Sequence, residues 1–245
     1  MPHYLIEFRF HGYAKKYLKR RIFEVARRFR VRGVTRKRPV PHITLAGPFE
    51  TRNIKRVIRD VESVAKNYDL VNFKLKGFGY FNNPNGKVIY ADIEPSKELE
   101  ELRWELAKRL MKYVELKEWD KDKKFSFHAT IAFKDIDRKF PKIWRYLKSK
   151  EEPNINQHLL RITILRNDKI LCEYDLMLKR LLNRRQALSK RIWKKTISML
   201  KMKLSREGKR GEIPLKKTRR GRLWAMIKKI FRRDDIPHKR FAFRP

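Results

Sequence analysis

Hydrophobic residues recur along the first 178 residues with two periods. Apolar and polar positions alternate in segments typical of strands, and apolar residues three and four positions apart predict helices between them. The predicted strands are 3–10, 39–49, 73–81, 87–93, 125–133, 159–166 and 169–178. The predicted helices are 14–30, 53–67, 96–114 and 141–147.

The order of these predicted elements repeats in outline. Strand, helix, strand, helix and hairpin are followed by helix, strand, helix and hairpin. This repeat predicts an α+β fold of two related, pseudo-symmetric lobes with antiparallel sheets. No apolar run approaches the roughly 20 residues that a membrane span needs, and the N-terminus lacks the pattern of a secretion signal. We therefore expect a soluble, cytoplasmic protein.

The density of positive charge rises after Leu178, where the periodic strand patterns stop. The chain has 65 Lys and Arg against 27 Asp and Glu, a formal net charge of +38. Residues 179–245 alone hold 25 of the basic residues and 4 of the acidic ones. We therefore expect a bilobal domain over 1–178 and a basic, helical C-terminal extension over 179–245.

Two apolar stripes at helical spacing lie in this extension. They are Ile192, Trp193, Ile197, Leu200 and Leu204, and then Leu223, Trp224, Ile227, Ile230 and Phe231. Three interpretations stay open: helices that pack on the lobes and widen an RNA-binding surface, helices on an anionic membrane, or a segment ordered only by RNA. Because an excess of positive charge is relieved by a polyanion, RNA is the favoured partner, ahead of a membrane surface and of a solvated surface with no specific partner.

Two short motifs carry the candidate chemistry. They are His42-Ile43-Thr44-Leu45-Ala46 and His128-Ala129-Thr130-Ile131-Ala132, both on predicted strands and at equivalent places in the two halves. Residues two apart on a strand share a face, so each His lies beside its Thr. The hydroxyl can donate to a phosphate oxygen and the imidazole can move a proton.

The two motifs, together with the Ala46-Gly47-Pro48-Phe49 continuation of the first, resemble the 2H phosphoesterase superfamily. Within it the chain is similar to the 2′-5′ RNA ligase and RNA 2′,3′-cyclic phosphodiesterase branch. The resemblance covers roughly residues 1–178. It implies two α+β lobes around a central cleft, with His42, Thr44, His128 and Thr130 as catalytic residues.

The resemblance also implies a reaction. His42 would protonate the 3′-oxygen of a 2′,3′-cyclic phosphate, His128 would act as the base on water, and the product would be a 2′-phosphate. The same pair would also catalyse reversible 2′-5′ joining, and the assignment of acid and base stays open. No cofactor is expected, because neither an ATP-binding loop nor a metal-ligand cluster is found.

Other candidate residues have competing structural explanations. Phe49 and Phe133 are candidates for stacking an RNA base, although core positions are favoured for both. Arg36, Lys37 and Arg38 precede the first motif and are candidates for contacting the RNA backbone or for a solvated loop. His3, His11, His158 and His238 lack metal-ligand spacing, and Cys172 is expected to be a small buried residue.

The sequence is therefore consistent with three candidate functions. The first is an RNA-end phosphodiesterase. The second is a non-catalytic RNA- or ribosome-binding protein on the same fold, against which the intact His and Thr at both motifs argue. The third is a phosphodiesterase of small cyclic nucleotides, which would not need the basic extension.

Overall fold

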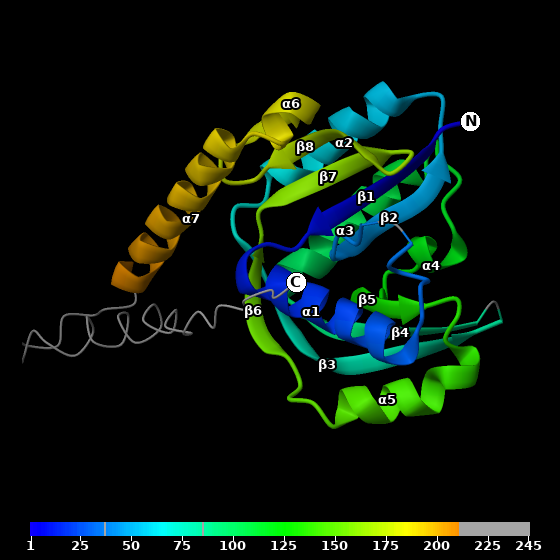
Figure 1. The fold of residues 1–245 in the computed structure, drawn as a ribbon. Coiled ribbons are helices and arrows are strands. Elements are labelled where there is room, and N and C mark those ends of the chain that lie inside the picture. Colours follow the sequence, from blue (N-terminus) through cyan, green and yellow to red (C-terminus); the bar gives the residue numbers. More distant parts are fainter. Residues whose placement is uncertain (37, 85, 211–245) are drawn as a thin grey trace, which may run out of the picture. The chain divides into compact units, whose positions relative to one another are not determined.

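The computed structural model describes residues 1–36, 38–84 and 86–210 (Figure 1). The strands are β1 (His3–Arg9), β2 (His42–Glu50), β3 (Val71–Asn83), β4 (Gly86–Pro95), β5 (His128–Phe133), β6 (Asn154–Leu159), β7 (Arg161–Arg166), β8 (Lys169–Asp175) and β9 (Arg180–Asn183). The helices are α1 (Gly12–Phe29), α2 (Ile54–Lys66), α3 (Lys97–Leu110), α4 (Glu118–Lys121), α5 (Phe140–Lys148), α6 (Arg184–Ala187) and α7 (Lys190–Arg210), with a 3₁₀ turn at Asp137–Lys139.

The strands form two antiparallel sheets. The five-stranded sheet has the order β2-β1-β7-β8-β9, and the four-stranded sheet has the order β5-β4-β3-β6. Every pair of neighbouring strands is antiparallel. The α+β class, the antiparallel sheets and a C-terminal helix, all predicted from the sequence, are confirmed.

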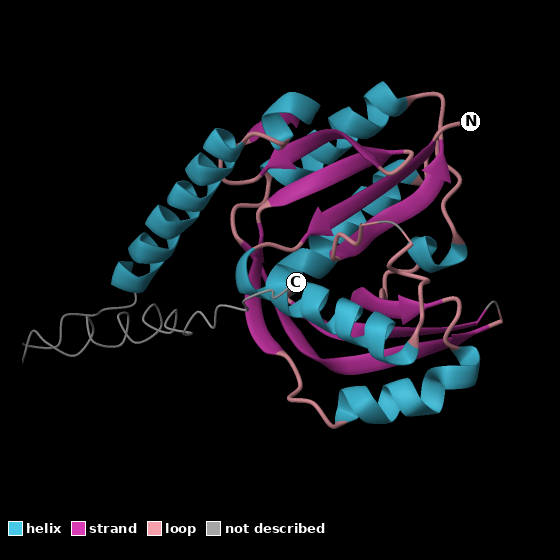
Figure 2. Cartoon of the chain, in the orientation of Figure 1, coloured by secondary structure: helices cyan, strands magenta, loops and turns pink. Residues whose placement is uncertain are grey.

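Helices cover the sheets on the faces that the apolar pattern predicts (Figure 2). Helix α3 packs against β2 of one sheet and β3 and β4 of the other, and α2 packs against α3, β7 and β8. Helix α1 packs against β5, and its residues Leu18, Ile22 and Val25 are buried and lie three or four positions apart. Cys172 on β8 is buried as expected, and burial raises the pKa of its thiol to about 12.

Some elements were not predicted. Strand β6 (Asn154–Leu159) is rich in polar residues, and β9 is four residues long, so neither gives a clear alternating pattern. Strand β9 pairs with β8, which carries the five-stranded sheet past Leu178. The first compact unit of the chain extends from Met1 to Lys201, whereas the sequence placed the end of the bilobal domain at Leu178.

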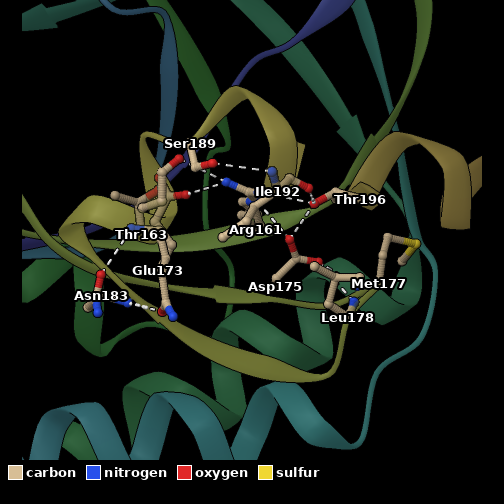
Figure 3. A network of polar contacts seen from close by, with 12 residues as sticks. Arg161, Thr163, Glu173, Asp175, Met177, Leu178, Asn183, Ser189, Ile192 and Thr196 are labelled. Atoms are coloured by element: carbon tan, nitrogen blue, oxygen red, sulfur yellow. Dashed lines mark hydrogen bonds and ion pairs between the residues drawn. The ribbon is translucent and has the colours of Figure 1, made fainter. Parts of the chain in front are cut away.

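A buried polar network connects α7 to the five-stranded sheet (Figure 3). The guanidinium of Arg161 on β7 donates to Asp175 at 2.8 Å, to Glu173 at 3.1 Å and to the hydroxyl of Thr196 on α7 at 2.8 Å. The Thr196 hydroxyl donates in turn to Asp175 at 2.6 Å. The Arg161 guanidinium also lies 4.9 Å from the ring centroid of Trp193. The first half of α7 is therefore part of the folded unit.

The first apolar stripe of the extension lies on α7, where its member Leu200 is buried. The neighbouring Thr196, which is not part of the stripe, is also buried. The second stripe, from Leu223 to Phe231, lies outside the described residues. Within the described ranges, no helix is long and apolar enough to span a membrane.

Candidate active site

The two motif strands are edge strands, one from each sheet. Strand β2 ends the five-stranded sheet and β5 ends the four-stranded sheet. The two strands approach each other, with Cα atoms within 8 Å across the gap (Figure 1). On both strands the residues between and after the motif positions are buried, whereas the His and Thr side chains are partly exposed. The alternation predicted from the sequence therefore places both His–Thr pairs away from the core.

Both catalytic candidates are held by the same hydrogen bond. His42 Nδ1 lies 2.8 Å from the carbonyl oxygen of Val40, and His128 Nδ1 lies 2.9 Å from the carbonyl oxygen of Ser126. A carbonyl oxygen only accepts, so Nδ1 carries the proton in each ring. This arrangement leaves Nε2 of each imidazole as the atom that can accept or donate a proton at the substrate.

The two imidazoles lie close enough to influence each other electrostatically. Burial lowers the pKa of His128 most strongly, and the positive charge of His42 lowers it further. The Ser126 carbonyl and the Asp92 carboxylate oppose this shift, but the net pKa of His128 stays below its ordinary value. The lowered pKa favours the neutral form of His128, which is the form that a general base requires.

The residues beside the two histidines differ, although the backbone arrangement is the same. On β1, the buried Glu7 places a carboxylate oxygen 3.7 Å from His42 Nδ1 and accepts a 2.6 Å hydrogen bond from Arg9. Around His128 the ring centroids of Phe81 and Tyr90 lie 4.9 and 5.3 Å away. One histidine thus has a charged neighbour and the other an aromatic one.

The Thr44 and Thr130 side chains are partly exposed beside these histidines. Within the described part of the chain, neither hydroxyl has a hydrogen-bond partner. Each is therefore free to donate to an anionic oxygen between the two strands. Among the described residues, no group of three or more His, Cys, Asp or Glu side chains is arranged to hold a metal ion.

The structure separates the two aromatic site candidates, Phe49 and Phe133. Phe49 is buried at 3% exposure and stacks on Tyr4, so it occupies the core position and offers no face to a base. Phe133 is half-buried and pairs with Val88, whereas His128 and Thr130 pair with Asp92 and Tyr90. Those three partners alternate on β4, and β5 has an extra residue between Thr130 and Ala132, so Phe133 lies on the same face of the sheet as His128 and Thr130. A contact of Phe133 with an RNA base stays a prediction.

The basic residues before the first motif lie on the surface. Arg36 and Arg38 are exposed, and Lys37 lies outside the described residues. The charge of Arg36 helps to lower the pKa of Asp135, which also accepts from the backbone of Arg32 and Gly33. A contact of Arg36 and Arg38 with RNA stays a prediction.

A buried ion pair fixes the end of the first motif strand. The Gly47 amide donates to the carboxylate of Asp120 at 3.0 Å, and Arg103 lies 3.4 Å from the other oxygen of that carboxylate. Both charged side chains are fully buried, and the Arg103 guanidinium also donates to the Asp120 carbonyl at 2.7 Å. Sequence patterns gave no indication of this pair, because its partners are far apart along the chain.

Gly47 itself is required by the backbone. Its φ is +106°, and a Cβ there would lie 3.0 Å from the Tyr4 carbonyl oxygen and 3.1 Å from the Phe49 ring. We expect Gly47→Ala to destabilise the fold by about 1–3 kcal/mol, measured by urea denaturation. Gly12→Ala is the control, because Gly12 also has a positive φ but nothing within 4 Å of its Cβ position. Equal effects of the two substitutions would show that the close contacts at Gly47 contribute nothing.

Three comparisons place the chain among known proteins. A family model, the 2′-5′ RNA ligase superfamily, matches residues 18–170, which include both His–Thr motifs. No curated protein matches the chain. Among solved structures, Kluyveromyces marxianus Usb1 with uridine monophosphate has 11% identity and a TM-score of 0.45, with 74% of this chain and 97% of that chain covered. A second structure of Kluyveromyces marxianus Usb1 has 10% identity and a TM-score of 0.41 over the same shares. Because the family model spans more than half of the chain, this protein belongs to the 2′-5′ RNA ligase superfamily.

Proposed function

We propose that this protein is a phosphodiesterase that opens the 2′,3′-cyclic phosphate at an RNA end and leaves a 2′-phosphate, without a metal ion. Membership of the 2′-5′ RNA ligase superfamily supports phosphodiester chemistry on RNA as the general kind of function. The observation that carries the finer proposal is the matched pair of imidazoles, each with Nδ1 bound to a carbonyl and Nε2 left for the substrate.

The proposed reaction uses the two imidazoles as base and acid. His128, neutral because its pKa is lowered, takes a proton from water as the water oxygen bonds to phosphorus. The bond from phosphorus to the 3′-oxygen breaks, and His42 gives that oxygen a proton. Thr44 and Thr130 donate hydrogen bonds to the non-bridging oxygens as negative charge develops. A 5′-hydroxyl in place of water would give 2′-5′ joining by the same steps.

Turnover in the presence of EDTA tests the proposal. The substrate is a short RNA that ends in a 2′,3′-cyclic phosphate, and chromatography separates the 2′-phosphate product from the 3′-phosphate. We expect ring opening to the 2′-phosphate. Tight binding without ring opening would favour a non-catalytic RNA- or ribosome-binding protein. Efficient opening of a mononucleoside cyclic phosphate, with no gain from a longer RNA, would favour the small-substrate alternative.

The pH dependence of kcat/KM is a second prediction. A general base acts in its neutral form, so the acid limb of the profile reports the pKa of His128. Since that pKa is lowered, we expect the midpoint of the limb below the ordinary histidine value of about 6.5. Asp92 raises the pKa of His128, so Asp92→Asn should move the limb further down in pH. Glu100→Gln, on the exposed side of α3, serves as the charge-matched control. An acid limb above 6.5, or one that moves up in Asp92→Asn, contradicts the assignment of His128 as the base.

A further inference from the structure

A groove of about 480 Å³ lies between α1 and α5. Its lining residues are Arg20, Phe23, Glu24, Arg27 and Arg28 of α1 and Tyr146 of α5. We call it the α1–α5 groove. Its volume falls within the roughly 300–1,000 Å³ typical of sites that hold small organic ligands.

The α1–α5 groove is separate from the histidine pair. Helix α1 packs on β5 with Ile22, which borders the same small void as Ile131. Because residues alternate between the two faces of a strand, Ile131 points away from the face of His128 and Thr130. Figure 1 shows α1 and α5 flanking the four-stranded sheet. The groove therefore belongs to the outer side of this sheet.

The groove combines cations with two aromatic rings, Phe23 and Tyr146. Phe23 is 45% exposed, an unusual position for a phenylalanine on a helix that has a buried face. The guanidinium of Arg28 lies 4.9 Å from the ring centroid of Tyr146, and Lys150 Nζ lies 4.8 Å from it. These contacts hold Tyr146 and its cations together as one platform.

The positive charge in the groove is only partly neutralised. Glu24 accepts hydrogen bonds from Arg20 at 2.8 Å and from Arg21 at 2.6 Å, so its carboxylate is already engaged. Arg27 and Arg28 are exposed, and neither pairs with a carboxylate in the ranges that the structure describes. Two guanidinium groups thus remain available for an anion beside Phe23 and Tyr146.

We propose that the α1–α5 groove binds single-stranded RNA, with a base stacked on Phe23 and with Arg27 and Arg28 on the flanking phosphates. Unpaired bases stack on aromatic rings and on guanidinium planes, whereas the bases of a duplex are not accessible in this way. An acidic peptide would use the arginines but would leave the exposed ring without a partner. The proposal rests on the proposed function for its substrate class, and it adds a second RNA contact remote from the histidines.

The test measures binding of a fluorescent single-stranded RNA that ends in a 3′-hydroxyl, so that no turnover is involved. We expect Phe23→Ala to raise Kd about tenfold, because one stacked base is lost. The double variant Arg27→Ala/Arg28→Ala should lower the salt-dependence slope of the binding constant by about 1.4, since each phosphate contact on a single strand contributes about 0.7. Lys55→Ala/Lys112→Ala, which removes two exposed charges elsewhere, should leave Kd and slope close to those of the wild type.

The outcomes separate this proposal from the proposed function. All groove variants should open a dinucleotide 2′,3′-cyclic phosphate as fast as the wild type. If the wild type opens no cyclic phosphate but the groove variants bind RNA more weakly, the proposed function fails and the groove proposal stands. RNA affinity unchanged in the groove variants, or lowered equally in the lysine control, overturns the groove proposal. Unchanged RNA affinity with lost binding to phosphatidylserine vesicles also overturns it, in favour of a lipid surface.

Discussion

Replacement of His42 or of His128 by alanine is expected to lower kcat/KM for an RNA 2′,3′-cyclic phosphate by about 10²- to 10⁴-fold. In the proposed mechanism, each substitution removes an Nε2 that moves a proton at one end of the breaking and forming bonds. Single-turnover measurements would show the loss in the chemical step, with RNA affinity nearly unchanged. Because the two residues act as a unit, the double variant should be hardly slower than either single variant.

His3→Ala is the matched control for this experiment. His3 is exposed on β1 and lies 3.2 Å from Glu50, at the end of the strand distant from Arg9 and His42. It should retain the activity of the wild type. Loss of activity in only one of the two site variants would contradict the two-histidine mechanism and leave a single proton-transfer residue.

The second large effect is expected at Arg161, in the stability of the fold. Arg161→Met keeps an unbranched apolar stem but leaves the buried carboxylates of Glu173 and Asp175 without their cation. Removal of one partner from a buried ion pair costs about 3–5 kcal/mol. For a chain of this size the loss corresponds to a fall of roughly 6–20 °C in the melting temperature, measured by calorimetry.

Two further variants are compared with Arg161→Met: one in the same network and one on the surface. Thr196→Val removes a hydroxyl that donates to Asp175 and accepts from Arg161, so it should also destabilise the fold, by about 1–3 kcal/mol. Lys97→Met breaks the exposed Lys97–Glu101 pair, whose atoms are 3.8 Å apart, and should leave the melting temperature unchanged. If Arg161→Met has the same melting temperature as Lys97→Met, the network does not hold α7 to the sheet.

The fold was predictable from sequence wherever the hydrophobic residues of a segment follow a single period, either that of a helix or that of a strand. The motif strands β2 and β5 and the helices α1 and α2 each have one apolar face, so both their type and their place were found. Strand β9, which ends the five-stranded sheet, was not predicted, because it has four residues and directly follows Lys179, whose φ is +50°. Hydrogen bonding to β8 forms that strand, and such tertiary pairing leaves little trace in the local sequence.

The site was predictable to the level of the motifs and no further. The His42–Thr44 and His128–Thr130 pairs were recognised because their spacing is local, and their catalytic role stays a prediction. Their neighbours depend on strand register: Glu7 lies opposite Thr44, and Tyr90 lies opposite Thr130. Register between strands distant in sequence is fixed by the packed core, which periodicity alone does not specify.

The identical bonds from His42 Nδ1 to Val40 and from His128 Nδ1 to Ser126 have a consequence for the direction of the reaction. Both rings are fixed as the same tautomer, so in the proposed reaction either one can serve as donor in one direction and as acceptor in the other, as microscopic reversibility requires. The backbone therefore gives the site no preferred direction. A preference comes only from the unequal surroundings, with Glu7 beside one ring and Phe81 beside the other. Exchanging those neighbours, rather than the histidines, is the change that would alter which ring donates first.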